Sequence, residues 1–408
     1  MSTRLRIGIE TRQMAGHMTG IGNYSFHLLQ ALATEPDLTF VGFGEYGWSD
    51  VNQETLARLG QAQAKTSHEP SHRRSARQRL GQLARRAARL GPARSAFRAS
   101  HTFLFGRTVR AQRLDLFHAL NFLPPSEPGV PTLPIVYDLS FLRHPDSHPK
   151  ERLKWLAGLR EVIAGAPLVH TISEFSKAEI HAAYGYPLER IFVAPPAAAD
   201  IFRPLGDEAT RRDLAPFDLA SQRYLLAVGT LEPRKNLRTL IAAYSRLREA
   251  DQQQVALAIA GGSGWGDIDL PKEASTLVRT GRLRFVGAVS DAQLRSLYEG
   301  AAAFFFPSIY EGFGMPVVEA MRCGTAVVHS EATAMDEIAP GLAQRIPALD
   351  VEAWTNAMRQ AANTPDAHDA AAREARIARA QTYRWDTSAK AVRAAYATIS
   401  GTNDAKSD

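Results

Sequence analysis

Glu311 and Glu319 bracket the segment with the clearest chemical character in this sequence. Seven residues lie between the two acids, and they begin with a Gly-Phe-Gly-Met-Pro run. Glycine lets the backbone approach a ligand closely, and Pro316 suits the first turn of a helix. N–H groups exposed at a helix start favour an anion such as a diphosphate, and a carboxylate can accept two hydrogen bonds from a vicinal diol. The segment therefore predicts a site for a phosphorylated ligand that carries hydroxyl groups.

Two neighbouring cations, Arg234 and Lys235, follow the apolar run Tyr224–Gly229. In a parallel α/β sheet, ligands bind beyond the carboxyl ends of the strands. Arginine can bind a phosphate through two parallel hydrogen bonds, and lysine acts on it as a point charge. Taken alone, the pair could be solvated loop charges. Together with the two glutamates in the same half of the chain, it predicts a clamp for a diphosphate.

Apolar runs that would position these residues alternate with helical patterns in both halves of the chain. Strands are predicted at Leu5–Glu10, Leu38–Phe43, Asp115–His118, Leu133–Asp138, Leu168–Thr171, Tyr224–Gly229, Val255–Gly261, Leu283–Val286, Phe304–Phe306 and Ala326–Val328. Strands that are apolar throughout are buried on both faces, as in doubly wound parallel sheets. We therefore predict an α/β fold with two Rossmann-like domains, residues 1–198 and 199–385, and a helix at about 386–402 that packs back on the first domain. A chain of 408 residues suits two domains of roughly 150 to 200 residues.

The composition is that of a well-buried globular protein, with 45% hydrophobic and 22% charged residues. It excludes collagen-like, disordered and disulfide-rich classes. Cys323 is the single cysteine, so no internal disulfide can form, and we interpret it as a buried structural thiol. The N-terminus lacks a signal-like apolar region, and no apolar run reaches the roughly 18 residues of a membrane span. We expect a cytoplasmic protein.

One segment carries the excess positive charge. The net charge is +6, and residues 71–114 contain twelve arginines, from Arg73 to Arg113, without any acidic residue. Leucines at helical spacing within Arg77–Leu90 predict a basic amphipathic helix, which could lie on the anionic inner face of the cytoplasmic membrane. A helix with a solvated basic face is the alternative. Nucleic-acid binding is a rival that we do not expect, because only Phe97, Phe103 and Phe105 are available for base stacking.

Three stretches resemble those of glycosyltransferase family 4, whose members are retaining enzymes with the GT-B fold. They are Gly229–Asn236, Pro307–Met321 and Thr171–Lys177, and the spacing of the two glutamates is that of the family's donor site. The resemblance implies two Rossmann-like domains that face a central cleft, and a nucleotide-sugar donor as substrate. No further cofactor is expected.

The resemblance also assigns roles in the donor site. Arg234 and Lys235 would hold the donor diphosphate. Glu319 would bind the nucleotide ribose, and Glu311 the transferred sugar. Backbone groups would complete the donor site at Phe313, Gly314 and Met315, with Gly229 and Val286 at two predicted strand ends.

The first half of the chain supplies weaker candidates. Gly20, Gly22 and Tyr24 lie in a run that resembles the family's N-terminal glycine loop, which reaches the donor phosphate or the acceptor. Asp138 falls where many members carry a histidine followed by an acidic residue, although here the histidine is replaced by Tyr137. We expect Asp138 to contact the sugar, with a capping role as the alternative. His118 closes a predicted strand and either faces the acceptor or is structural.

Retention of configuration is what the resemblance implies for the reaction. Retention through a covalent intermediate needs a carboxylate nucleophile about 5 Å from a second carboxyl group, and we expect no such pair here. The departing diphosphate would instead help to deprotonate the acceptor hydroxyl on the same face, with Arg234 and Lys235 stabilising its charge. We predict a metal-independent enzyme. The run Gly261–Gly264 lacks the spacing of a dinucleotide fingerprint and is interpreted as a tight turn.

The glycine loop and the Glu-Gly-Phe-Gly-Met-Pro run are most similar to those of bacterial mannosyltransferases and rhamnosyltransferases of surface polysaccharide assembly. This likeness implies transfer of a hexose from a GDP-sugar to a lipid-linked or polysaccharide acceptor. A nucleotide-sugar epimerase of the same fold, acting on UDP-GlcNAc, is the alternative enzyme. Neither the sugar nor the acceptor follows from the residues themselves.

Overall fold

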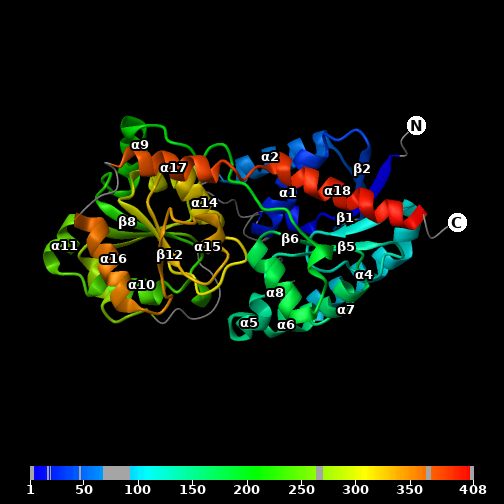
Figure 1. Ribbon diagram of the computed structural model, residues 1–408, viewed down its shortest axis with the longest axis horizontal. Helices are drawn as coiled ribbons and strands as arrows, with labels where there is room; N and C mark the ends of the chain where they lie inside the picture. The colour runs from blue at the N-terminus through cyan, green and yellow to red at the C-terminus, as the bar shows by residue number, and fades with distance from the viewer. Residues whose placement is uncertain are drawn as a thin grey trace.

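Two α/β lobes, each built on one sheet, lie along the long axis of the molecule (Figure 1). The structure is a computed structural model, and it describes residues 4–15, 18, 20–45, 47–67, 92–262, 270–363 and 369–404. The basic helix predicted within Arg77–Leu90 lies outside these residues. Within them, no helix combines the length and the apolar character that crossing a membrane requires.

The first lobe holds a seven-stranded sheet with the order β3-β2-β1-β4-β5-β6-β7. Its strands are β1 (Leu5–Glu10), β2 (Leu38–Gly44), β3 (Gly47–Val51), β4 (Leu116–Ala119), β5 (Thr132–Val136), β6 (Val169–Thr171) and β7 (Ile191–Val193). Neighbouring strands are parallel except for β3, which forms an antiparallel hairpin with β2. The strand order reverses between β1 and β4, so ligands are expected at the carboxyl ends of these central strands.

The second lobe holds a six-stranded parallel sheet with the order β10-β9-β8-β11-β12-β13. Its strands are β8 (Tyr224–Val228), β9 (Ala256–Ala260), β10 (Leu283–Gly287), β11 (Ala303–Phe306), β12 (Val327–Ser330) and β13 (Gln344–Ile346). Here the order reverses between β8 and β11. The loops that follow these two strands carry Arg234, Lys235 and Glu311, so the topology brings the predicted site residues together.

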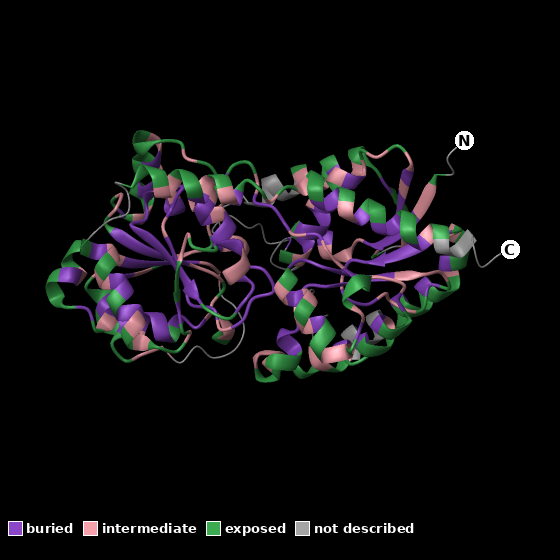
Figure 2. Cartoon of the chain, viewed as in Figure 1, coloured by how far each residue is buried: buried purple, intermediate pink, exposed green. Residues whose placement is uncertain are grey.

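Helices cover both faces of each sheet, and the strands form the buried layer in each lobe (Figure 2). In the first lobe they are α1 (Gly20–Leu32), α2 (Gln53–Ser67), α4 (Pro92–Thr108), α5 (Ser140–Arg143), α6 (Lys150–Leu156), α7 (Leu159–Gly165) and α8 (Glu174–Tyr184). In the second lobe they are α9 (Asp207–Leu214), α10 (Leu237–Ser245), α11 (Glu249–Gln254), α12 (Ala274–Arg279), α13 (Asp291–Gly300), α14 (Met315–Arg322), α15 (Met335–Ile338), α16 (Val351–Asn363) and α17 (Ala370–Ala380). Short 3-10 helices are η1 (Arg12–Met14), η2 (Val109–Gln112), η3 (Pro145–Ser147), η4 (Leu188–Arg190), η5 (Ala215–Phe217) and η6 (Pro233–Lys235).

The predicted fold class, two doubly wound Rossmann-like units, is confirmed by these two sheets. The edge strand β3 and the strands β7 and β13 were not predicted, because β3 is polar and the other two are only three residues long. Helix α9 lies between the predicted strands Leu168–Thr171 and Tyr224–Gly229, and its first turn is acidic and its last turn basic, as favours a helix.

The last helix, α18 (Trp385–Asp404), returns to the first lobe and packs against α1 (Figure 1). The hydroxyl of Ser388 donates a hydrogen bond to the carbonyl of Pro195 at 2.6 Å. On its outer side, Arg393 forms ion pairs with Asp37 and Glu35. Helix α18 therefore ties the end of the chain to the lobe in which the chain begins.

A chain of hydrogen bonds runs through the core of the first lobe and ends on α18. The hydroxyl of Tyr396 lies 2.7 Å from His118 Nδ1, His118 Nε2 lies 3.0 Å from His170 Nδ1, and His170 Nε2 lies 2.9 Å from the hydroxyl of Tyr24. Tyr24 donates to the carbonyl of Ala194 at 2.7 Å, so its oxygen must accept from His170. Both histidines are then neutral with the proton on Nε2, and Tyr396 donates to His118.

Burial holds both histidines in this neutral form, because it lowers the pKa of His118 to about 3 and that of His170 well below its ordinary value. In the unfolded chain a histidine titrates near pKa ~6.5. Between these pKa values the unfolded state binds more protons than the folded state. The two neutral histidines therefore make their full contribution to the free energy of unfolding above about pH 6.5, and this contribution falls as the pH falls toward 3.

We predict that, as the pH is lowered from 8 to 5, His118→Gln loses less free energy of unfolding than the wild type does. The variant lacks one of the two histidines that must stay neutral in the fold. Urea unfolding at each pH measures both slopes. Equal slopes in the two proteins would contradict the neutral hydrogen-bonded chain.

Candidate active site

The loops that follow β8 and β11 are joined by backbone and side-chain hydrogen bonds. Asn236 takes a left-handed conformation with φ 54°, and its amide group donates to the carbonyls of Pro307 at 3.1 Å and Ala348 at 2.7 Å. The N–H of Ile309 donates to the carbonyl of Arg234 at 2.9 Å. These bonds hold η6, which carries both cations, against the loop that carries Glu311.

Glu311 is buried between the two cations. Its Oε1 lies 2.6 Å from Lys235 Nζ, and its Oε2 lies 3.0 Å from Arg234 Nη1. On its other side, Arg234 pairs with Glu232 at 2.8 Å. The side chains of Glu311, Arg234 and Lys235 are only 11%, 16% and 13% exposed. The sequence-predicted clamp and the predicted sugar-binding acid therefore form one ionic cluster.

The cluster fixes the charges of its members. Burial alone would raise the pKa of Glu311, but Arg234 and Lys235 outweigh it and lower this pKa to about 2. Burial would likewise lower the pKa of Arg234, whereas the carboxylates of Glu311, Asp138 and Glu232 raise it above its ordinary value. Glu311 is thus a charged hydrogen-bond acceptor at neutral pH and cannot act as a general acid.

Lys235 keeps donors free for a further anion. An ammonium group has three N–H donors, and Glu311 occupies one of them. The Lys235 ammonium also lies 4.9 Å from the ring centroid of Phe306. Its stem packs over Gly229, where a Cβ would lie 3.3 Å from Lys235 Cδ and where φ is 155°. Glycine at this position therefore leaves room for the lysine to reach the site.

The segment between the two glutamates forms a tight turn before α14. Gly314 has φ 113°, and a Cβ there would lie 2.8 Å from Met335 Cγ. The ring of Phe313 packs edge-on against Tyr383, with 5.3 Å between centroids. The backbone N–H groups of Phe313, Gly314 and Met315 donate no hydrogen bond among the described residues. They are thus available to an anion at the start of α14.

Glu319 lies one turn into α14, on a partly buried face. The hydroxyl of Tyr298 donates to its Oε2 at 3.0 Å. Burial raises the pKa of Glu319 to about 7, although the Tyr298 hydrogen bond works in the opposite direction. Unlike Glu311, this carboxyl group forms no ion pair with a described residue, so its charge state near neutral pH is open to influence by a ligand.

Asp138 comes from the first lobe and lies against the turn. A Cβ on Gly312 would be 2.7 Å from Asp138 Cβ and 2.2 Å from the carbonyl oxygen of Tyr137. One carboxylate oxygen of Asp138 accepts from the N–H and the hydroxyl of Ser140, at 2.8 and 2.6 Å. Asp138 therefore has the turn-forming role expected as one alternative, at a position close enough to act on Arg234.

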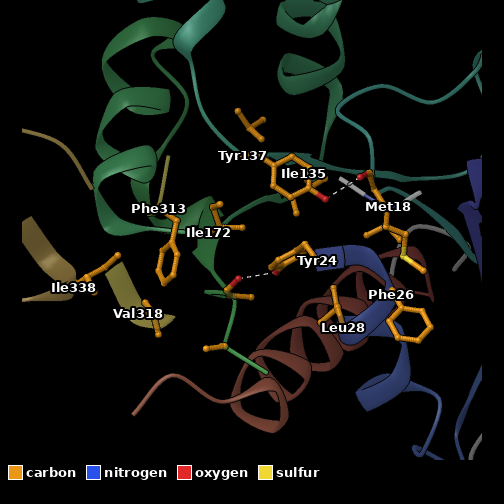
Figure 3. Packing of buried hydrophobic residues seen from close by; sticks show 14 of the residues in the cluster. Met18, Tyr24, Phe26, Leu28, Ile135, Tyr137, Ile172, Phe313, Val318 and Ile338 are labelled. Atoms are coloured by element: carbon orange, nitrogen blue, oxygen red, sulfur yellow. Dashed lines mark hydrogen bonds between the residues drawn. The ribbon is translucent and has the colours of Figure 1, made fainter. Parts of the chain in front are cut away.

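Tyr137, which replaces the family histidine, lies in the core. Its hydroxyl donates to the carbonyl of Leu120 at 2.9 Å, and its ring packs edge-on against Tyr24 with 5.5 Å between centroids (Figure 3). Only its backbone touches the turn at Gly312. The Tyr137 side chain therefore lies in the interior and does not face the turn.

Two candidates from the first half are corrected by their burial. His118 and Tyr24 are 0% and 4% exposed, and both have their polar atoms engaged in the chain that ends at Tyr396. Neither side chain faces a ligand, because the sheet and α18 enclose them. His118 is therefore structural, the second of its two predicted roles, whereas the expected contact of Tyr24 with a phosphate or an acceptor is wrong.

The glycines of the first half have different surroundings. Gly22 is a packing position, since a Cβ there would lie 2.3 Å from the carbonyl oxygen of Gln13. Gly20 is exposed at the first residue of α1 and has open space around it. Thr19, which precedes it, lies outside the described residues. Gly20 thus remains a candidate on position alone.

Gly261 and Val286 lie at the ends of two strands near the expected nucleotide. Gly261 is tightly packed, whereas Val286 is partly exposed. A Cβ on Gly261 would lie 1.9 Å from the carbonyl oxygen of Gly229, as suits the tight turn predicted there. Val286 is partly exposed beside Gly287, which has φ 80°. Ser263 and Gly264 lie outside the described residues.

Three contributors to the site were missed in the sequence. Glu232 stands two residues before Arg234 and pairs with it. Asn236 ends the cationic motif and joins the two loops. Tyr310 precedes Glu311 and reaches the first lobe, where its hydroxyl accepts from the N–H of Leu139 at 3.1 Å. All three lie inside motifs that were recognised in the sequence. Their positions could therefore be predicted, but their partners could not.

Among the described residues, no group of three or more His, Cys, Asp or Glu side chains could hold a metal ion.

Comparison with solved structures concerns the fold. Sucrose-phosphate synthase from Thermosynechococcus elongatus superposes with a TM-score of 0.70 at 18% identity, over 98% of this chain and 100% of that one. HepE from Anabaena, solved in complex with UDP and glucose, gives a TM-score of 0.67 at 17% identity, over 97% and 100%. These likenesses span both lobes, and the predicted GT-B arrangement is confirmed.

Comparison of sequences identifies the family. The profile described as glycosyl transferases group 1 matches residues 213–378, which include the cationic motif and both glutamates. The O-antigen chain mannosyltransferase B of Escherichia coli is 32% identical over 337 residues, which are 82% of this chain and 84% of that protein. The chain therefore belongs to the group 1 glycosyltransferases.

Proposed function

We propose that this glycosyltransferase moves a hexose, mannose or rhamnose, from a GDP-sugar to a hydroxyl group of a lipid-linked or polysaccharide acceptor, with retention of configuration. The observation that carries the proposal is the cluster in which Arg234 and Lys235 flank the ionised Glu311. It offers cations for a diphosphate and a charged acceptor for sugar hydroxyls within one loop pair.

We propose a separate set of contacts in the second lobe for the diphosphate, the sugar and the ribose of the donor. The diphosphate would contact Lys235, Arg234 and the free N–H groups at the start of α14. Glu311 would accept hydrogen bonds from the sugar hydroxyls, and Glu319 from the ribose. Val286 and Gly229 at the neighbouring strand ends are proposed as backbone contacts. Each of these groups lies at the carboxyl edge of the second sheet.

The proposed reaction breaks the bond between the anomeric carbon and the diphosphate oxygen. The acceptor oxygen forms the new bond on the same face, and its proton passes to the departing phosphate oxygen. GDP and the lengthened glycan are the products. Lys235 and Arg234 stabilise the charge that develops on the leaving group, which is commonly the largest catalytic contribution. Asp138 would contact the sugar from the first lobe.

The identity of the sugar rests on likeness. The relative from Escherichia coli is named as an O-antigen chain mannosyltransferase, and a second from Salmonella typhimurium, O-antigen chain mannosyltransferase RfbU, is 30% identical over 146 residues. These names support mannose as the first sugar to test and surface polysaccharide assembly as the process. HepE, solved with UDP and glucose, makes UDP the first alternative nucleotide.

We predict that, among GDP-, UDP-, ADP- and dTDP-sugars, GDP-mannose raises the melting temperature most, because a ligand that binds only the folded state stabilises it. Transfer to an acceptor glycan should then proceed at the same rate with and without EDTA. Thermal-shift screening and a radiolabelled transfer assay measure the two effects.

Other outcomes of this experiment separate the alternatives. Conversion of UDP-GlcNAc without any acceptor would replace the proposal by an epimerase. A larger thermal shift with another nucleotide sugar would contradict the GDP-linked donor. Loss of transfer in EDTA that manganese restores would contradict metal independence.

Lys235→Ala should lower the turnover number by about 10² to 10³ fold, the range seen when one donor to a developing anion is removed. The free energy of unfolding of Lys235→Ala should change little, because Glu311 still pairs with Arg234. Lys272→Ala, at an exposed lysine of the same lobe, serves as the matched control. Near-normal turnover of Lys235→Ala would remove this residue from the proposed mechanism.

The first lobe carries a surface that suits a membrane-bound acceptor. Phe103 and Leu104 on α4 are 67% and 37% exposed, and Arg107, Arg110 and Arg113 follow with exposed side chains. Exposed apolar and basic side chains together favour the surface of an anionic bilayer. We propose that this surface brings the enzyme to lipid-linked acceptors.

We predict that the protein sediments with vesicles that contain phosphatidylglycerol and not with phosphatidylcholine alone, and that Phe103→Ser weakens this binding. Phe285→Ser is the matched control, since Phe285 is an aromatic residue that is 40% exposed in the second lobe. Equal binding of the two variants would show that the α4 surface does not contact the bilayer.

A further inference from the structure

The first turn of helix α8 is capped from the opposite lobe. Glu337 Oε1 accepts from the N–H of Glu174 at 3.2 Å, and Oε2 accepts from the N–H of Phe175 at 2.9 Å. The helix's own N-cap, Ser173, satisfies the N–H of Ser176 at 2.9 Å. A helix start carries unpaired N–H groups and partial positive charge. Glu337 therefore supplies the partners that the sequence of α8 does not.

The same helix start binds the turn that contains Gly312. The hydroxyl of Ser173 donates to the carbonyl of Gly312 at 2.6 Å, and that of Ser176 lies 3.2 Å from the same oxygen. Because a Cβ on Gly312 would lie 2.2 Å from the carbonyl oxygen of Tyr137, the two backbones are in direct contact. The position of this turn is thus set by the first lobe.

Tyr310 extends the contact to the cations. Its ring lies 5.6 Å from the ring of Phe175, centroid to centroid, and its hydroxyl accepts from the N–H of Leu139. Its carbonyl accepts from Arg234 Nη1 at 2.5 Å. A change in the relative position of the two lobes would therefore displace Arg234, which pairs with Glu311.

Apolar packing accompanies these polar contacts. One core cluster contains buried residues of both lobes, and Phe313, Val318 and Ile338 of the second lobe lie near Ile172 of the first (Figure 3). Arg379 stabilises helix α15, which carries Glu337. Its guanidinium donates hydrogen bonds to the carbonyls of Glu337 and Ile338 at 2.7 and 2.9 Å. Glu337 thus projects from a fixed element across the contact.

We propose that Glu337 is a positioning residue that holds the lobes closed through the start of α8 and so fixes Gly312 and Glu311 against Asp138. Its effect on turnover rests on the proposed function, whereas the closing contact itself does not. Glu337 touches neither cation, so its role in the reaction is exerted through the position of the turn.

Glu337→Gln tests this role with little change in shape. A side-chain amide has one oxygen to accept with, and its NH₂ group would face an N–H of α8. We expect a larger radius of gyration by small-angle X-ray scattering without ligand. We also expect kcat to fall about tenfold to hundredfold, as for a misplaced catalytic group. The KM for the donor should change less than kcat, because Lys235, Glu319 and the start of α14, which we propose as donor contacts, lie in the second lobe.

Glu374→Gln, at an exposed glutamate of α17, is the matched control and should resemble the wild type in both measurements. Glu337→Ala provides a second variant, and unfolding midpoints establish that each protein is folded. A wild-type radius in both Glu337 variants would overturn the closing contact. A larger radius with wild-type kcat would overturn the positioning role. If the wild type transfers no sugar, the proposed function fails, while the scattering comparison still decides the contact.

Discussion

Glu311 is a buried carboxylate whose charge is maintained by two cations that lie within 3.0 Å of it. A buried carboxylate without a cation would destabilise the fold by roughly several kcal/mol. The loops around Glu311 must therefore keep both cations beside it. Asn236 holds the loop of the cations in place, Gly229 leaves room for the stem of Lys235, and the glycine turn carries the acid. The geometry of the proposed donor site follows from satisfying this one charge.

The cluster also links the two lobes. Arg234 holds the carbonyl of Tyr310, and Tyr310 and Gly312 contact the first lobe directly. A donor bound at the second sheet would therefore lie beside Asp138 only when α8 and the turn are in contact. In this arrangement, the proposed closing contact and the proposed site of the leaving group share the same short segment.

Strands β8 and β11 and the charged motifs that follow them were predictable, because both strands are continuous apolar runs. The partners within the cluster were not. Glu337 meets Phe175 across 162 positions of sequence, and Tyr396 meets His118 across 278. Sequence patterns show that His118 closes a strand, but whether its side chain faces solvent or the interior depends on α18, which packs over it from the far end of the chain. Burial of Tyr24 escaped prediction for the same reason.

A crystal structure of the protein with GDP-mannose would test the central claim most directly. The account predicts the diphosphate within hydrogen-bonding distance of Lys235 and Arg234, the mannose hydroxyls on Glu311, and the ribose on Glu319. The Glu311 carboxylate should remain beside both cations. A diphosphate bound away from this cluster, with the sugar remote from Glu311, would contradict the account.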